Sequence, residues 1–262
     1  MTESGIVSVT FRQLSPDEII ALVNEAGLTA IEWGGDIHVP HGNLETAREV
    51  GVRTRNAGLE IASYGSYYRA VESEASGLAF ESVLETALAL GAPLIRIWAG
   101  RKSPKDADER YRDMIASETH RIAECASDAG IRIAYEYHPN TLTETPESTV
   151  ALLDAVSHGN VFTYWQAPLN ATPEQRVASL EAVLPYLANI HVFHLRIMNG
   201  ETCRRPLAEG KFDWIRDLSM VSRDSRPHYA LLEFVLGDDP GNFLRDAATL
   251  RKWLAHTSSQ EK

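Results

Sequence analysis

One local pattern occurs four times in this chain: a helical stretch ends in glycine, and a short apolar run follows at once. The four instances are residues 24–27 before 29–33, 56–58 before 59–63, 90–91 before 94–98 and 129–130 before 131–138. Glycine just past a helix adopts the left-handed conformation that closes the last turn. A helix followed directly by a strand is part of a β/α unit, and repeats of roughly 30 to 40 residues build a barrel or a doubly wound sheet.

The number of predicted strands decides between these two folds. The chain of 262 residues holds eight candidate strands, each followed by a helix or a long loop. They are residues 6–11, 30–33, 59–63, 94–98, 131–137, 161–165, 190–196 and 229–235. A (β/α)₈ barrel takes about 250 residues, whereas a doubly wound sheet usually has fewer strands. Since no linker separates the repeats, we expect an α/β protein with a single (β/α)₈ TIM barrel domain over residues 1–262, its first few residues loose.

The composition argues against several classes of function. A formal net charge of −11 opposes binding to nucleic acid or to an anionic membrane surface, which both require clustered basic residues. No apolar run approaches the roughly 20 residues of a membrane-spanning helix. The N-terminus shows no signal segment, and Cys125 and Cys203 form no disulfide framework, so we expect a cytoplasmic protein. A nucleotide-binding loop is not indicated, because Gly34 and Gly35 lack the third glycine.

Two glutamates lie within apolar strands. Glu136 stands between tyrosines, and Glu233 follows two leucines. Glutamate is almost never fully buried without a partner, and a divalent cation bound by both carboxylates would provide one. His194 and the carbonyl oxygen of Gln166 would complete a set of oxygen and nitrogen ligands. All four residues lie at the C-terminal ends of strands, where barrel active sites form, so the pattern predicts a metal site there.

The alternation of side chains along a strand assigns further residues to this site. In residues 190–196 it places His194 and Arg196 on one face, so that His191 is expected to be structural or to face the helices. His138 shares a face with Glu136. Tryptophans at strand ends offer flat apolar faces to a sugar ring, and two loop arginines suit an anionic or polyhydroxylated substrate. The predicted substrate-binding residues are His138, Arg196, Trp33, Trp98, Trp165, Arg204 and Arg205.

Each of these residues has a structural alternative. Glu136 could form an ion pair with Arg96 or Arg132, and Glu233 could also belong to a plain ion pair. A strand histidine is often a hydrogen-bonded core residue, tryptophans at strand ends can pack the barrel, and loop arginines can be surface charges. The joint occurrence of two glutamates and a histidine at strand ends favours the functional interpretation.

These residues resemble motifs of the sugar phosphate isomerase/epimerase group, in the xylose isomerase-like barrel superfamily. The resemblance covers nearly the whole chain and rests on Glu136-Tyr-His138-Pro, Trp165-Gln-Ala-Pro, His194-Leu-Arg196 and Leu232-Glu233-Phe. It implies one divalent ion (Mn, Mg, Co or Zn) held by Glu136, a residue at position 166, His194 and Glu233. Gln166 stands where the family usually has Asp, and the loss of a negative ligand should weaken metal binding or change the preferred metal. The multi-zinc endonuclease branch of this superfamily needs more His and Asp ligands than the chain offers.

The sequence therefore predicts a sugar isomerase or epimerase. One of the two glutamates would remove the proton α to a carbonyl, the other would return it, and the metal would stabilise the enediolate. The expected partner is a small carbohydrate substrate, and a homo-oligomer remains open. Two alternatives stand beside this prediction. A metal-dependent lyase or dehydratase could use the same carbanion on a keto-sugar or sugar acid, and a sugar-binding barrel could have lost both metal and activity.

Overall fold

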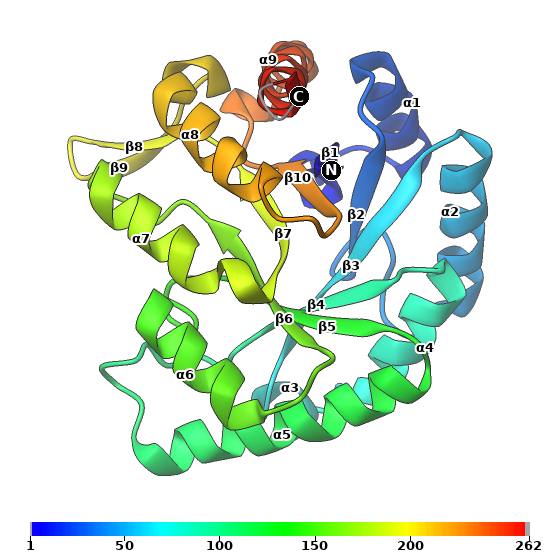
Figure 1. Ribbon diagram of the computed structural model, residues 1–262. Coiled ribbons are helices and arrows are strands. Elements are labelled where there is room, and N and C mark those ends of the chain that lie inside the picture. The colour runs from blue at the N-terminus through cyan, green and yellow to red at the C-terminus, as the bar shows by residue number, and fades with distance from the viewer. Residues whose placement is uncertain (1, 260–262) are drawn as a thin grey trace.

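The computed structural model describes residues 2–259, which form a closed barrel of eight parallel strands (Figure 1). The strands pair in the order β1-β10-β7-β6-β5-β4-β3-β2, so β1 closes the barrel against β10. They are β1 (Thr2–Val7), β2 (Ala30–Gly34), β3 (Glu60–Arg69), β4 (Leu94–Trp98), β5 (Arg132–Tyr135), β6 (Val161–Gln166), β7 (Leu187–Val192) and β10 (His228–Leu232). The predicted single (β/α)₈ TIM barrel is confirmed. Of the domain expected over 1–262, Met1 and residues 260–262 lie outside the described residues.

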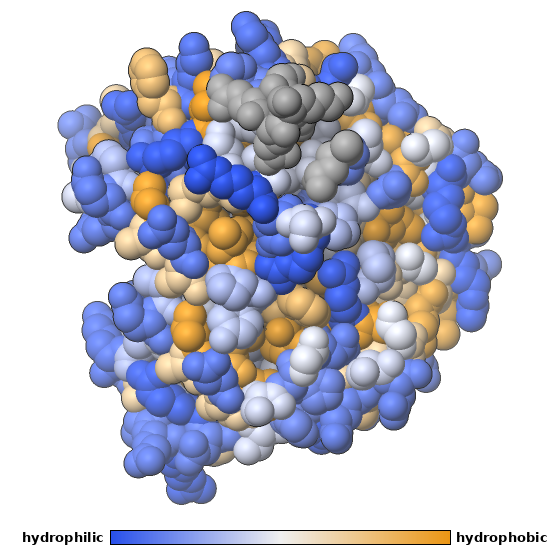
Figure 2. Space-filling model, in the orientation of Figure 1, coloured by the Kyte–Doolittle hydropathy of each residue, from blue (hydrophilic) through white to orange (hydrophobic). Residues whose placement is uncertain are grey.

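Helices surround the barrel and, with the loops, connect each strand to the next (Figure 1). They are α1 (Pro16–Ala26), α2 (Leu44–Asn56), α3 (Glu72–Ala75), α4 (Phe80–Leu90), α5 (Glu109–Asp128), α6 (Pro146–Val156), α7 (Pro173–Val183), α8 (Lys211–Ser222) and α9 (Pro240–Ser259). Short 3₁₀ turns are η1 (Ser8–Phe11), η2 (Leu184–Tyr186), η3 (Leu207–Gly210) and η4 (Leu236–Asp238). Hydrophilic residues predominate on the face of the molecule in Figure 2, and across residues 2–259 no helix has the length and apolar character needed to cross a membrane. A cytoplasmic location stays a prediction.

The repeated glycine pattern accounts for the ends of several helices. Gly27 closes α1 with φ of 64°, and Gly91 closes α4 with φ of 81°. Gly130, with φ of 72°, follows the last turn of α5. At the other end of α1, Ser15 and Glu18 form a reciprocal capping box. These local signals set where each helix begins and ends, and thereby where the next strand starts.

The barrel interior has an apolar lower layer and a polar upper layer. Ala30, Leu94, Ala134, Tyr164 and Leu231 are buried together in the lower layer. Because side chains alternate along a strand, the residue two positions further on points into the barrel one layer higher. Those residues are Glu32, Arg96, Glu136, Gln166 and Glu233. The alternation thus brings a polar cluster to the C-terminal ends of the strands, above an apolar floor.

Several strands differ from the sequence-based expectation. β3 continues to Arg69 instead of ending at residue 63, while β5 ends at Tyr135 and β10 at Leu232, short of the predicted residues 137 and 235. β1 begins at Thr2 and pairs with β10, so the first residues are not loose, and the segment 8–11 is a 3₁₀ turn rather than strand. β7 ends at Val192 instead of continuing to residue 196. The chain then forms an antiparallel hairpin of β8 (Leu195–Met198) and β9 (Glu201–Arg204) at the edge of the molecule (Figure 1). Residues of this hairpin therefore do not follow the inward–outward alternation of the barrel.

Candidate active site

Ionisable side chains are concentrated in the upper layer of the barrel. Glu32, Arg96 and His191 are at most 1 % exposed, and Glu136 and Glu233 are 5 % and 7 % exposed. Burying a charge is costly unless it is paired and hydrogen-bonded. The partners of each group therefore determine its charge state and its chemistry.

Arg96 lies between two carboxylates on one side of the cluster. Its Nε donates to Glu32 Oε1 at 2.8 Å, and its Nη1 donates to Glu136 Oε2. Trp98 Nε1 donates to the same oxygen of Glu136. Burial opposes ionisation of Glu136, but the charges of Arg96 and His191 and the hydrogen bond from Trp98 act together against burial, and the pKa of this carboxyl is lowered. The ion pair with Arg96 that the sequence left open is thus present, and it holds Glu136 ionised and oriented.

His191 lies at the end of β7 and faces the remaining oxygens of the cluster. Its Nδ1 is 3.3 Å from Gln166 Oε1, 3.4 Å from Glu233 Oε2 and 4.0 Å from Glu136 Oε1. Its Nε2 is 3.7 Å from Glu32 Oε1. Burial favours the neutral ring, but the surrounding carboxylates outweigh burial and raise the pKa of His191.

Glu233 is the carboxylate with the least support. Its Oε2 is buried and has no hydrogen-bond partner among the described residues. Burial raises the pKa of Glu233 to about 7, with a further contribution from the charge of Glu136, while His191 acts in the opposite direction. A carboxyl that titrates near neutral pH can take up and release a proton at working pH, as a general base requires.

The atoms around His191 Nδ1 match the donor set of a divalent metal site. Glu136, Gln166 and Glu233 each direct one oxygen toward this nitrogen, and such mixed oxygen and nitrogen sets bind ions such as Mg, Mn, Co or Zn. A cation would also satisfy the unpartnered oxygen of Glu233. Within residues 2–259, no group of three or more His, Cys, Asp or Glu side chains is spaced as metal ligands, so an ion would have to draw these side chains closer together. Glu32, which faces the opposite nitrogen of His191, would orient the imidazole from behind.

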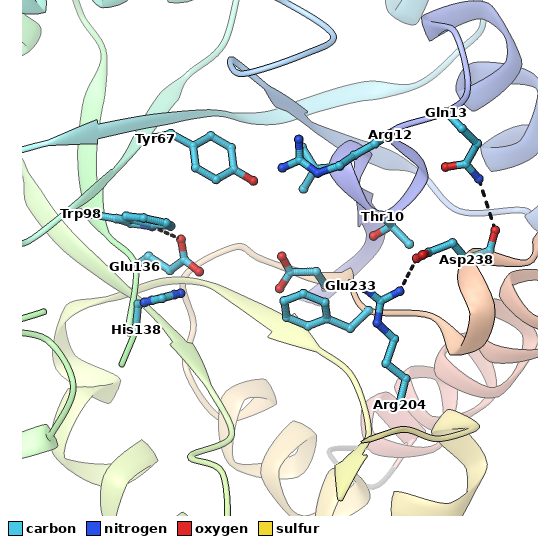
Figure 3. A pocket seen from close by; sticks show the side chains of 12 residues that line it. Thr10, Arg12, Gln13, Tyr67, Trp98, Glu136, His138, Arg204, Glu233 and Asp238 are labelled. Atoms are coloured by element: carbon cyan, nitrogen blue, oxygen red, sulfur yellow. Dashed lines mark hydrogen bonds and ion pairs between the residues drawn. The ribbon is translucent and has the colours of Figure 1, made fainter. Parts of the chain in front are cut away.

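The cluster opens into a cavity of about 270 Å³. Figure 3 shows Glu136 and Glu233 facing each other across it, with Tyr67 and Arg12 along one side. Two lining residues have left-handed backbone conformations that residues with side chains rarely adopt, Tyr67 with φ of 56° and Phe234 with φ of 51°. Such strain persists where the surrounding structure enforces it, and it is frequent at functional sites.

Three of the predicted substrate-binding residues line this cavity: Trp98, His138 and Arg204 (Figure 3). Trp98 cannot serve as a platform for a sugar ring, because both of its faces are covered. The His138 ring stacks on it with centroids 4.6 Å apart, and the Arg69 guanidinium lies 3.5 Å from its centroid, too close for both to share one face. Trp98 instead positions His138 and Glu136. Arg204 is paired with Asp238 at the cavity wall.

Trp33 and Trp165 face the helices, so the prediction that they contact substrate is wrong. Both are fully buried, and their indole N–H groups donate to hydroxyls of α2 and α7. The cause is the alternation of the strands. Glu32 and Gln166 point into the barrel, and their neighbours Trp33 and Trp165 therefore point out.

His194 lies outside the cluster, so the structure does not bring it together with Glu136, Gln166 and Glu233 as the predicted ligand set requires. β7 ends before it, and His194 lines a separate cavity with Arg196, whose Nε is 3.3 Å from His194 Nε2. Arg196 is accordingly not placed to orient a substrate beside Glu136. Arg205 is exposed, pairs with Glu209 and does not line the active-site cavity.

Sequence reasoning missed Glu32 and His191. Glu32 stands in an apolar strand, as Glu136 and Glu233 do, and the argument from buried carboxylates applies to it equally. His191 is the strand partner of Gln166 across β6 and β7. The expectation that the strand continues to residue 196 places His191 on the outer face. β7 ends at Val192, so the alternation does not extend to His194 and Arg196.

Comparisons with known proteins identify the family. The sequence pattern of the xylose isomerase-like TIM barrel family matches residues 20–252, and the chain belongs to this family. A 3-dehydroshikimate dehydratase of Bacillus anthracis is 36 % identical over 67 residues, which are 26 % of this chain and 24 % of that protein. The matched stretch thus spans about a quarter of the curated relative.

Three solved structures share the fold over nearly the whole chain. A probable 3-DHS dehydratase of Bacillus anthracis, involved in petrobactin synthesis, has a TM-score of 0.77 at 22 % identity and covers 96 % of this chain and 99 % of that one. A xylose isomerase-like TIM barrel protein of Mycobacterium smegmatis, in complex with magnesium, has a TM-score of 0.75 at 17 % identity, and the match covers 98 % of each chain. A D-psicose 3-epimerase of Clostridium cellulolyticum with D-tagatose has a TM-score of 0.72 at 14 % identity, and the match covers 98 % of this chain and 99 % of that one. At these identities the likeness shows the fold.

Proposed function

We propose that this protein is a divalent-metal-dependent enzyme that removes the proton α to the carbonyl of a small polyhydroxylated substrate, with Glu233 as the base. The main observation behind the proposal is that the two carboxylates facing each other across the cavity, Glu136 and Glu233, differ in their hydrogen-bond partners. Glu233 keeps a buried oxygen without a partner, whereas Glu136 receives hydrogen bonds from Arg96 and Trp98. The magnesium bound by one structural neighbour supports a cation in this fold.

Glu136, Gln166, His191 and Glu233 would hold the ion. When bound, the ion would polarise the substrate carbonyl and make the neighbouring C–H more acidic. The cavity of about 270 Å³ limits the reacting part of the substrate to a small molecule. Glu233 would take the α proton, because its carboxylate borders the cavity and, unlike that of Glu136, is not held by Arg96 and Trp98.

The pairing of Glu136 favours elimination over two-base epimerisation. Epimerisation at one carbon requires a second acid that delivers a proton from the opposite face, and Glu136 is held ionised by Arg96. With one base, the electron pair of the broken α C–H bond forms a double bond as the β C–O bond breaks, and the departing hydroxide takes up the proton that Glu233 removed and leaves as water. Tyr67 borders the cavity and stays protonated because burial raises its pKa, so it can donate a hydrogen bond to the departing oxygen. The resemblance to a dehydratase supports this outcome.

The test is incubation of the metal-loaded protein in D₂O with a panel of keto-sugars and hydroxylated keto acids, followed by mass spectrometry. We expect a product that has lost one water, and a rate at least about a hundredfold lower in Glu233→Gln, which removes the base. Glu209→Gln is the matched control, because Glu209 is an exposed carboxylate outside the cavity.

Two other outcomes would change the assignment. An isomer of the substrate that carries deuterium, with no loss of water, would establish the isomerase or epimerase prediction instead. Neither product nor exchange with any member of the panel would contradict α-proton removal and leave the sugar-binding alternative.

A further inference from the structure

A second cavity, of about 300 Å³, lies between the β6–α7 loop, the start of α7 and the segment that enters β8. These elements are adjacent in Figure 1, where the β8–β9 hairpin projects beside α7 and α8. The lining includes Arg176, His194, Arg196 and Asp213. None of these residues belongs to the cluster around His191, so the active site does not account for them.

Arg176 is held rigidly at one wall of this cavity. Its guanidinium carbon lies 4.4 Å from the ring centroid of Trp214 and 5.5 Å from that of Trp165. Its Nε donates to Asp217, while its Nη2 is buried and has no hydrogen-bond partner among the described residues. Buried polar groups are nearly always paired, and a guanidinium whose position is already fixed loses little conformational freedom on binding an anion.

The charges around the cavity leave one cation without a carboxylate. Asp217 pairs with Arg176 and Arg216, and Asp213 pairs with Arg216. Across residues 2–259, no ion pair includes Arg196, and the carboxylate whose charge acts on it, Glu209, is paired with Arg205. The group therefore carries an excess of positive charge, in a chain whose formal net charge is −11.

His194 adds a neutral hydrogen-bond donor to this group. Arg196 Nε donates to His194 Nε2 at 3.3 Å, so the ring proton resides on Nδ1. Burial, and then the charge of Arg196, lower the pKa of His194, which keeps the ring neutral in the absence of an anion. Arg176 and Asp213 line the same cavity as His194 and Arg196, and Glu209 also acts on the His194 ring.

We propose that this second cavity is an anion-binding site, in which Arg176 and Arg196 bind a phosphate or carboxylate group beside His194. The site stands independently of the proposed reaction. It shares Phe193 and Leu195 as lining residues with a neighbouring cavity that reaches Glu136 and Gln166. The anion could therefore be the distal group of a substrate or a free anion from solution, and the two sources share the same recognition chemistry.

The experiment measures binding of inorganic phosphate to the purified full-length protein by calorimetry, at constant ionic strength against chloride. We expect saturable binding that Arg196→Gln weakens by about tenfold or more, since one charge-assisted hydrogen bond is lost. Arg205→Gln is the matched control, because Arg205 is a nearby exposed arginine that does not line the cavity. Both substitutions are at exposed positions and should leave the fold intact.

Equal affinity in wild type, Arg196→Gln and Arg205→Gln would place the phosphate elsewhere, for example on a metal ion, and would overturn the proposal, as would the absence of saturable binding. Once a substrate is known, phosphate that raises its KM in wild type but not in Arg196→Gln would identify the anion as part of the substrate. Phosphate that binds without changing KM would identify a free anion. Failure of the proposed reaction leaves the phosphate measurement unaffected.

Discussion

Glu136 and Glu233 are the same residue type at the same level of the barrel, and their environments give them opposite properties. Arg96 and Trp98 both donate to Glu136 and stabilise its charge, while Glu233 has only His191 nearby and keeps an unpartnered oxygen. Environments that push two pKa values apart assign roles to otherwise equivalent carboxylates. The assignment of Glu233 as the base therefore depends on the single arginine that was placed beside Glu136.

The raised pKa of Glu233 predicts a pH-dependent effect of Glu233→Gln on stability. In the metal-free protein this pKa is raised from 4.5 to about 7, so the stability contributed by Glu233 is present below about pH 4.5 and is lost as the pH rises through 7. Glutamine stays neutral and avoids this loss. Above pH 7, the free energy of unfolding of the variant should exceed that of wild type by about 1–3 kcal/mol, and below pH 4.5 the two should agree.

Urea unfolding of the chelator-treated proteins at several pH values measures this difference. Glu209→Gln should show no gain in stability above pH 7, because Arg205 lowers the pKa of Glu209 and the substitution removes a favourable charge there. A difference between Glu233→Gln and wild type that does not change with pH would mean that Glu233 is already paired in the metal-free protein.

The local sequence signals predicted the presence of helices and strands more accurately than the residues at which the strands end. The helix–glycine–strand repeats led correctly to the barrel, because helix capping and hydrophobic periodicity depend on residues close in sequence. The end of β7 has no such local signal. β7 ends at Val192 because the chain then turns into the β8–β9 hairpin. The expected strand extends past this point and therefore favours His194 instead of His191.

The alternation of side chains along the strands was sufficient to predict the orientation of two tryptophans. Once Glu32 and Gln166 are assigned to the interior, Trp33 and Trp165 must face the helices. By contrast, the covering of Trp98 by Arg69 and His138 joins three different loops and strand ends, and no sequence pattern indicates it. The carboxylates of the candidate site were thus predictable from burial, whereas the contacts that tune them were not.

The glycine that follows α5 offers a direct test of the pattern that led to the fold. Gly130 has φ of 72° and Gly159 has no positive φ, and an added Cβ would meet nothing within 4 Å at either position. Gly130→Ala should therefore lower the free energy of unfolding by about 1 kcal/mol through backbone strain alone. Gly159→Ala should be neutral or slightly stabilising. Urea midpoints compare the two, and equal effects would show that the left-handed conformation is not what requires glycine here.

At the scale of the whole molecule, the closed barrel is what brings these residues together. Glu136, Gln166, His191 and Glu233 come from the ends of β5, β6, β7 and β10, which are neighbours in the barrel but are spread over about a hundred residues of sequence. The apolar lower layer closes the barrel beneath them. The cluster borders the cavity above this layer, and a cation bound there would link four strands at once.

Metal binding should therefore stabilise the entire barrel, and it should depend on His191 and not on His194. We expect about one Mn, Mg, Co or Zn ion per chain by elemental analysis, and a gain of about 2.7 kcal/mol in the free energy of unfolding at a free metal concentration of one hundred times Kd. His191→Ala should abolish both effects, and His194→Ala should leave both unchanged, because His194 lines the second cavity. Circular dichroism checks that His191→Ala still folds, and Glu233→Gln provides a second ligand variant. If neither metal content nor metal-dependent stabilisation is found in wild type, the cluster around His191 is a network of ion pairs, and the barrel is better assigned to the binding of sugars without catalysis.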